Sequence, residues 1–210
     1  WQSSISCNDC HQTNLFIDPS IKNVTEEGRS RYLEILKFRK KVLGISGTLS
    51  PMAKVDFVVF GDSRSDLETN KLIVRLLSQD EPQAIFHTGD MVANGGNRSE
   101  WETILPLYQP FIEKKNLYHS CGNHEGNYCT DNLLRKALKN TQPFYTVDLK
   151  DLTFIALDSN QITSEEIKWL SSLPKGKKYI PFFHHPAYPV MSGHGPNTSV
   201  IKNFIPQFKR

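Results

Sequence analysis

Hydrophobic and polar residues alternate in blocks of two kinds along most of the chain. Short runs rich in β-branched and aromatic residues are typical of strands that are buried on both faces. Longer segments with apolar residues every three or four positions are typical of helices that cover a sheet. These patterns predict strands over 55–61, 84–88, 116–120, 144–149, 153–157 and 178–184, and helices over 31–43, 67–78, from about 100, over 131–139 and from Thr163.

Two of the predicted helices carry a start signal. Ser99 is followed three residues later by Glu102, and Thr163 by Glu166. Each pair fits a capping box, in which the two side chains satisfy backbone N–H groups of the first turn. Pro106 and Pro110 follow the first of these signals. We expect them to kink or break that helix, because proline lacks an N–H group.

The order of elements indicates an α/β fold. Repeated strand–helix–strand units predict a sheet covered by helices, and the two strands within 144–157 predict an antiparallel hairpin. Residues 1–30 are polar and show no clear period, and 44–50 resemble a linker. We therefore expect two parts: an irregular segment plus one helix over 1–50, and an α/β domain over 51–210.

Composition narrows the choice of partners. The 210 residues carry a formal net charge of +3, and no run is rich in lysine and arginine. A nucleic acid or an anionic membrane is therefore not indicated as the main partner. The longest apolar runs have the length of a strand, so we expect no membrane span. Nothing in the composition indicates an oligomeric state.

Side chains that bind metals follow the predicted strands. The first strand ends in Gly61-Asp62, the second in Gly89-Asp90, the third in Gly122-Asn123, and the last at His184. One Gly-Asp pair is usually a simple turn, but four such ends in order are hard to explain by turn chemistry. In α/β sheets, ligands gather at the carboxyl ends of the strands. Carboxylate, amide oxygen and imidazole together suit Mn, Fe or Zn.

The same motifs resemble those of a known superfamily. In order, G-D-x-x, G-D-x-x-x-x-G, G-N-H-E and H-H-P are similar to the calcineurin-like metallophosphoesterases, in their bacterial and purple-acid-phosphatase-like branch. The resemblance covers the chain from about residue 54 to its end. It implies a four-layer α-β-β-α sandwich and a dinuclear metal site. It also implies hydrolysis of phosphate esters, with a metal-bound hydroxide as the nucleophile.

The resemblance implies a role for each matching residue. Asp62 is expected to bind the first metal and Asp90 to bridge both, while Asn123 and His184 bind the second. His124 is expected to lie beside the metals without binding them. It would donate a proton to the leaving oxygen, or act as a cation that stabilises charge on the phosphate.

Substrate contacts are expected from Arg64, His185 and His194. Many family members have histidine at the position of Arg64, but a guanidinium has no lone pair for a metal. We expect Arg64 to bind phosphate oxygens in a catalytic role. The alternative is an arginine paired to a neighbouring acid at the rim of the sheet.

The family's last motif, G-H-x-H, has no match in this chain. Gly193-His194-Gly195-Pro196 comes too early and has proline in place of the second histidine. We therefore expect the true motif beyond Arg210 and a domain that is incomplete at its C-terminus.

The cysteines raise separate hypotheses. Cys7-x-x-Cys10-His11 matches the attachment motif of haem c, and a redox or structural Cys7–Cys10 pair or a metal clip are the alternatives. Cys121 and Cys129 flank the G-N-H-E loop, and form a disulfide in an oxidising compartment or two thiols elsewhere.

The sequence thus predicts a metallophosphoesterase with two metal ions, acting on a phosphate ester. If the haem or the disulfide is present, the protein lies outside the cytoplasm, in a periplasm or secreted. Two alternatives remain open: a non-catalytic binding scaffold whose site has decayed at Arg64, and a haem c redox protein fused to this fold.

Overall fold

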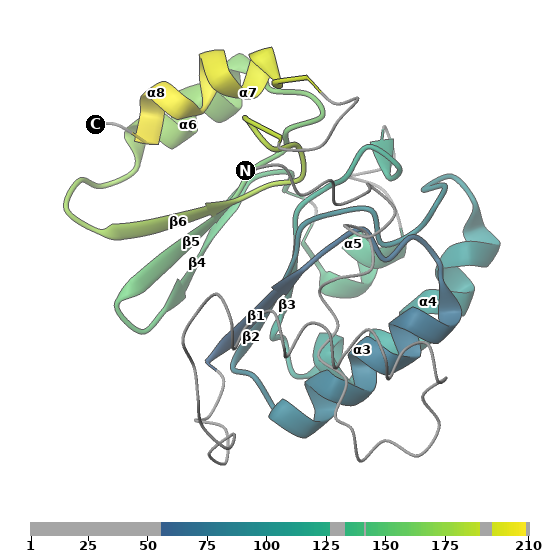
Figure 1. Cartoon of the computed structure of the whole chain (residues 1–210). Helices are drawn as coiled ribbons and strands as arrows, with labels where there is room; N and C mark the ends of the chain where they lie inside the picture. The colour runs from purple at the N-terminus through teal and green to yellow at the C-terminus, as the bar shows by residue number, and fades with distance from the viewer. Residues whose placement is uncertain (1–55, 127–132, 141, 190–194, 209–210) are drawn as a thin grey trace, which may run out of the picture. The chain divides into compact units, whose positions relative to one another are not determined.

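The first sheet is formed by three parallel strands. A computed structural model of the chain describes residues 56–126, 133–140, 142–189 and 195–208. Strands β1 (Phe57–Phe60), β2 (Ala84–His87) and β3 (Leu117–His119) pair in the order β1-β2-β3, as Figure 1 shows. In this register Phe60 lies opposite His87, and His87 lies opposite His119. The carboxyl ends of all three strands therefore lie at one edge.

The second sheet contains the predicted hairpin. Strands β4 (Tyr145–Leu149) and β5 (Leu152–Ala156) are antiparallel, and β6 (Lys178–Phe182) lies parallel to β5. The order is β4-β5-β6. Because β6 runs parallel to β5, the chain must cross over between them, and helix α6 (Ser164–Ser172) makes this crossover.

Helices cover the outer face of each sheet. Helices α3 (Leu67–Asp80), α4 (Arg98–Glu113) and α5 (Leu133–Leu138) lie on the first sheet in Figure 1, and α6, α7 (Thr198–Asn203) and α8 (Ile205–Phe208) lie on the second. The buried side chains agree: Ile85 of β2 packs with residues of α3 and α4, and Ile155 of β5 packs with residues of α6 and α7.

The two sheets face each other across an aromatic core. Phe86 of β2 stacks on Phe154 of β5 with ring centroids 4.0 Å apart, and it meets Phe182 of β6 edge to face at 5.1 Å. These side chains belong to one buried cluster with Ala84 and Ala156. The four-layer α-β-β-α arrangement predicted from the sequence is therefore confirmed.

Helix α4 differs from its prediction at its N-cap and at its two prolines. Its N-cap is Asn97, whose side chain accepts the N–H of Ser99, so the predicted capping box at Ser99 is wrong. The helix also runs unbroken through Pro106 and Pro110. Trp101, Ile104, Tyr108, Phe111 and Ile112 are all buried on it, and packing of this face holds the helix despite the missing N–H groups.

The other helices follow the sequence more closely. Thr163 caps α6 as predicted, since its side chain accepts the N–H of Glu166. Helices α7 and α8 were not predicted. None of the helices in the described part of the chain is long and apolar enough to cross a membrane. The predicted helix over 31–43 lies outside the described residues.

Candidate metal centre

The loops that follow β1 and β2 are hydrogen-bonded side by side. The N–H of Asp62 donates to the carbonyl of Gly89 at 2.9 Å, and that of Arg64 donates to the carbonyl of Asp90 at the same distance. Asp62 and Asp90 both adopt the left-handed backbone conformation, with φ of 57° and 59°. Aspartate reaches this region more easily than most residues do. The strain is held by the backbone hydrogen bonds between the loops.

The loop after β3 approaches the same place so closely that glycine is required. A Cβ on Gly122 would lie 2.0 Å from Oδ1 of Asp90, and one on Gly89 would lie 2.3 Å from the nitrogen of Gly122. The backbone N–H of His124 then donates to Oδ1 of Asp90 at 2.9 Å. Asp90 is thus enclosed by the loops that follow β2 and β3.

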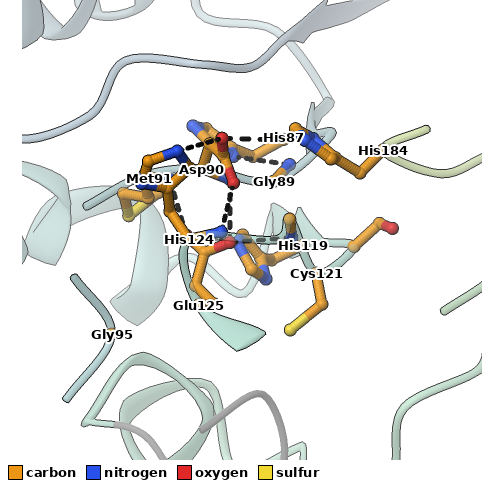
Figure 2. A network of polar contacts seen from close by, with 12 residues as sticks. His87, Gly89, Asp90, Met91, Gly95, His119, Cys121, His124, Glu125 and His184 are labelled. Carbon is orange, nitrogen blue, oxygen red and sulfur yellow. Dashed lines mark hydrogen bonds and ion pairs between the residues drawn. The ribbon is translucent and has the colours of Figure 1, made fainter. Parts of the chain in front are cut away.

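The structure brings three of the predicted metal ligands together. Single ligand atoms of Asp62, Asp90 and His184 all lie within 4.8 Å of one another. Asp90 is fully buried, and its Oδ2 has no hydrogen-bond partner among the described residues. A buried carboxylate oxygen without a donor costs free energy unless a positive charge faces it. Figure 2 shows this side chain between His124 and His184.

Polar atoms of His184, Asn123 and Asp90 lie close together at the centre. Nδ1 of His184 lies 3.0 Å from the carbonyl of Thr88, so Nδ1 carries the hydrogen and, in the neutral ring, Nε2 carries a lone pair. That Nε2 lies 2.9 Å from Oδ1 of Asn123 and 3.6 Å from Oδ2 of Asp90. With a neutral ring all three atoms are acceptors, and a bound cation would be their common partner. The donor set therefore fits a metal ion, and the Thr88 carbonyl orients the imidazole as metal-binding histidines require.

Arg64 lies between the two carboxylates. Its Nη2 is 3.3 Å from Oδ1 of Asp62 and 3.2 Å from Oδ2 of Asp90. The contact to Asp90 is an ion pair whose geometry does not make a hydrogen bond. The structure thus shows the arrangement that was the alternative for Arg64, an ion pair with neighbouring acids. Its contact with phosphate stays a prediction.

A family model for calcineurin-like phosphoesterases matches residues 7–208. The chain belongs to this family. The match confirms the resemblance read from the motifs, including the metallophosphoesterase class, and it extends into the segment before residue 54. No curated protein matches the chain.

Two solved structures are similar to this family member. One is the purple acid phosphatase PPD1 from seeds of yellow lupin (Lupinus luteus), with a TM-score of 0.40 and 20% identity. That alignment covers 63% of this chain and 30% of the lupin chain. The other is YfcE, a phosphoesterase from E. coli, with a TM-score of 0.37 and 16% identity over 52% of this chain and 60% of that one. The chain thus spans less than two thirds of either protein.

In this family member His124 lies beside the ligand cluster. Its Nδ1 is 2.7 Å from the carbonyl of Ala93 and therefore carries a hydrogen, while its Nε2 is 3.8 Å from Oδ2 of Asp90. The ring is partly exposed. Nε2 is thus the atom available to a substrate at the cluster, which is the position that the predicted proton donor needs. The role itself stays a prediction.

Glu125 has a part that the sequence did not reveal. Its carboxylate accepts the backbone N–H groups of Asp90 at 2.8 Å, Met91 at 2.6 Å and Gly122 at 2.7 Å (Figure 2). Burial acts to raise its pKa, but the nearby ring of His119 and the backbone donors outweigh burial and hold the pKa below its usual range. Glu125 thus fastens the loop after β2 to the loop after β3. The signal in the sequence that could have indicated this role is the place of Glu125 at the end of the G-N-H-E motif.

Two buried histidines, His87 and His119, lie next to the loop that follows β2. Nδ1 of His87 accepts the N–H of Gly89 at 3.1 Å, and its ring stacks on that of His119 with centroids 5.3 Å apart. Burial lowers the pKa of His87 to about 3, with the charge of His119 acting in the same direction. His87 is therefore neutral at ordinary pH, consistent with a structural part for this residue.

The second sheet contributes supports from the loop after β5. Nδ2 of Asn160 donates to the carbonyls of Cys121 at 3.2 Å and Gly122 at 3.1 Å. Oγ of Ser159 accepts the N–H of His185 and lies 3.0 Å from Nδ1 of the same residue. His185 is thus held against Ser159, and its predicted contact with substrate stays a prediction.

Several predicted residues lie outside the described part of the chain. They are the haem motif Cys7, Cys10 and His11, the loop residue His194, and Cys129. The haem hypothesis and the role of His194 therefore stay predictions. Cys121 is disulfide-bonded, so the disulfide alternative is the one that holds for this residue.

Proposed function

We propose that this protein hydrolyses phosphate esters with two metal ions bound at the candidate centre. The observation that supports the proposal is the buried Oδ2 of Asp90, which has no hydrogen-bond donor among the described residues and lies in a cluster with Asp62 and His184, while Asn123 contacts His184. Arg64 faces Oδ2 of Asp90 without making a hydrogen bond to it, and a metal ion would satisfy the acceptors that Arg64 leaves without a donor. Membership of a phosphoesterase family supports the reaction.

The ligand atoms suggest how two ions are divided. Asn123 and His184 would hold one ion, Asp62 would hold the other, and Asp90 would contact both. Carboxylate, amide and imidazole donors suit Mn, Fe or Zn. When bound, such ions neutralise charge on the phosphate and activate the attacking water.

The chain's own residues bind and orient the ester. Both ion pairs of Arg64 use Nη2, and its Nη1 makes no hydrogen bond or ion pair with the described residues. The guanidinium is partly exposed, so it can exchange its carboxylate partners for phosphate oxygens when Asp62 and Asp90 bind metal. The Nε2 of His124 faces the same space and donates a proton to the leaving oxygen, or stabilises charge there.

The test is hydrolysis of p-nitrophenyl phosphate and bis-p-nitrophenyl phosphate with added Mn²⁺, with and without a chelator. Asp90→Ala is expected to lose bound metal and activity together, because Asp90 supplies the buried charge of the centre. Asp151→Ala is the matched control, since that carboxylate is exposed in the turn between β4 and β5 and pairs with Lys178.

Two results contradict the proposal. A wild-type protein that binds metal but hydrolyses neither ester is a binding scaffold on the same fold. Normal metal content in Asp90→Ala removes Asp90 from the ligand set. Metal analysis by mass spectrometry distinguishes the two outcomes.

We also propose a location outside the cytoplasm. The disulfide of Cys121 supports it, because disulfides persist mainly in oxidising compartments. Alkylation of the protein as extracted from cells, without reductant, is expected to leave Cys121 unmodified. Visible absorption of the same sample tests the haem hypothesis for Cys7, Cys10 and His11.

A further inference from the structure

Glu100 gathers hydrogen bonds from two loops of the centre. It lies in the first turn of α4, and its Oε2 accepts the N–H groups of Ala93 at 2.8 Å and Asn94 at 3.2 Å. The same oxygen accepts the hydroxyl of Ser65, which in turn accepts the N–H of Ala93 at 3.1 Å. Oε1 accepts from Nδ2 of Asn97 at 3.0 Å. One carboxylate thus ties the loop after β1 to the loop after β2.

These donors favour the ionised carboxylate. Burial acts to raise the pKa of Glu100, but the hydrogen bonds from Ser65, Ala93, Asn94 and Asn97 outweigh burial and hold the pKa below its usual value. The group therefore carries a negative charge at neutral pH.

A single peptide group connects Glu100 to His124. The N–H of Asn94 and the carbonyl of Ala93 belong to the same trans peptide and point in opposite directions. The N–H faces Glu100, and the carbonyl accepts Nδ1–H of His124 at 2.7 Å. A negative charge on the N–H side polarises the peptide and makes its oxygen a stronger acceptor.

A second pair of contacts fixes the same loop. The N–H of Gly95 donates to the carbonyl of His124 at 2.8 Å, and Nε1 of Trp101 donates to the carbonyl of Gly95 at 2.8 Å. Trp101 follows Glu100 in α4. The first turn of this helix therefore contacts the Ala93–Asn94 peptide through Glu100, and through Trp101 it contacts the carbonyl of Gly95, the residue whose N–H binds the His124 carbonyl.

We propose that Glu100 is a positioning residue that fixes the tautomer and the orientation of the His124 ring through the Ala93–Asn94 peptide. The inference rests on the proposed function, in which Nε2 of His124 faces the leaving oxygen. Holding the hydrogen at Nδ1 leaves Nε2 as the atom that exchanges a proton with the substrate. Without the carboxylate, the N–H of Asn94 loses its partner, so the Ala93 carbonyl and the ring that it binds are held less firmly.

The first test compares Glu100→Gln with Glu102→Gln. Glu102 lies two residues further along the same helix and pairs with Arg98 at the surface, so it is the matched control. For phenyl phosphate, whose leaving group needs a proton, we expect Glu100→Gln to lower kcat by roughly 10-fold to 100-fold. For p-nitrophenyl phosphate the loss is smaller, because that leaving group departs without a proton. KM and bound metal are expected to stay near wild type, while the melting temperature falls because an amide cannot accept all the hydrogen bonds that the carboxylate receives.

A double mutant decides whether the effect passes through His124. In a His124→Ala background, Glu100→Gln is expected to cause no further fall in kcat. Independent losses that multiply in the double mutant overturn the proposal, as does an equal loss for both esters or an equal effect of Glu102→Gln.

A spectroscopic measurement separates this inference from the proposed function. Long-range ¹H–¹⁵N spectra of the wild-type protein are expected to show His124 with its hydrogen on Nδ1, and Glu100→Gln to show a mixture of tautomers. If the wild type hydrolyses neither ester, the proposed function fails, and the spectra still decide the positioning. An unchanged tautomer in Glu100→Gln overturns it.

Discussion

Two buried glutamates, one near each sheet, differ in the number of hydrogen-bond donors that face their carboxyl groups. Glu125 receives three backbone N–H groups at the centre beside the first sheet. Glu166, in α6 behind the second sheet, is also fully buried, but its Oε1 accepts only the N–H of Asp158 at 2.8 Å and its Oε2 has no hydrogen-bond partner among the described residues.

Their protonation follows from this difference. Burial raises the pKa of Glu166 to about 8, and the nearby charge of Asp158 adds to the shift, whereas hydrogen bonds hold the pKa of Glu125 below its usual range against the same effect of burial. Burial alone therefore does not decide the charge of a carboxyl group; the number of donors aimed at it does. The centre keeps a carboxylate where loops must be held together, and the second sheet tolerates one that is largely neutral.

The largest expected effect comes from Glu125→Gln. An amide has one oxygen for three N–H donors, and its own NH₂ group would face one of them, so the loops after β2 and β3 separate. We expect a loss of about 3–5 kcal/mol in the free energy of unfolding. Urea denaturation measures it, and calorimetric titration with Mn²⁺ is expected to show weaker binding. Wild-type stability in this variant would mean that the Glu125 carboxylate does not hold the loops after β2 and β3 together.

A smaller loss of stability is expected from a substitution at Gly122, where the loop after β3 contacts the loop after β2 without a hydrogen bond from the substituted side chain. Gly122→Ala places a Cβ 2.0 Å from Oδ1 of Asp90, and the backbone has to shift at the centre. We expect a loss of roughly 2–4 kcal/mol by urea denaturation, together with weaker metal binding. Gly176, in the turn before β6, is the matched control. It has a φ of 88° and nothing near its Cβ position, so Gly176→Ala is expected to cost only about 1–2 kcal/mol of backbone strain and no metal affinity. An equal loss of stability in Gly122→Ala and Gly176→Ala would mean that the close contact at the centre has no special cost.

The last expected effect concerns Glu166 and depends on pH. The pKa of Glu166 is about 8 in the folded protein and has its ordinary value of 4.5 in the unfolded chain, so the wild type loses stability as pH rises from about 4.5 through 8. The loss is at most about 1.4 kcal/mol per pH unit in this window. Glu166→Gln cannot ionise, and we expect it to flatten this slope and to gain stability over wild type at pH 8 but not at pH 4.5. Parallel curves for the two proteins from urea denaturation would show that Glu166 stays ionised.

Much of the fold could be predicted because its signals are local. The apolar runs before Asp62 and Asp90 predicted strands, and the spacing of apolar residues in α3 predicted a helix. The errors lie where tertiary packing overrides a local signal. Helix α4 continues through Pro106 and Pro110 because one face of it is buried in the core. Its cap is Asn97, two residues before the hydroxyl that matched the motif.

By itself, the sequence determined the order of the elements, the family, and which side chains stand at the carboxyl ends of the strands, since these follow from residue type and spacing along the chain. Only the tertiary structure decided which atoms face each other. Glu125 receives donors from two loops, Arg64 lies between two carboxylates, and Glu100 reaches His124 through one peptide. Hydrogen bonds depend on direction and on separations of about 3 Å, and loops far apart in the sequence acquire both only when the sheets and helices hold them.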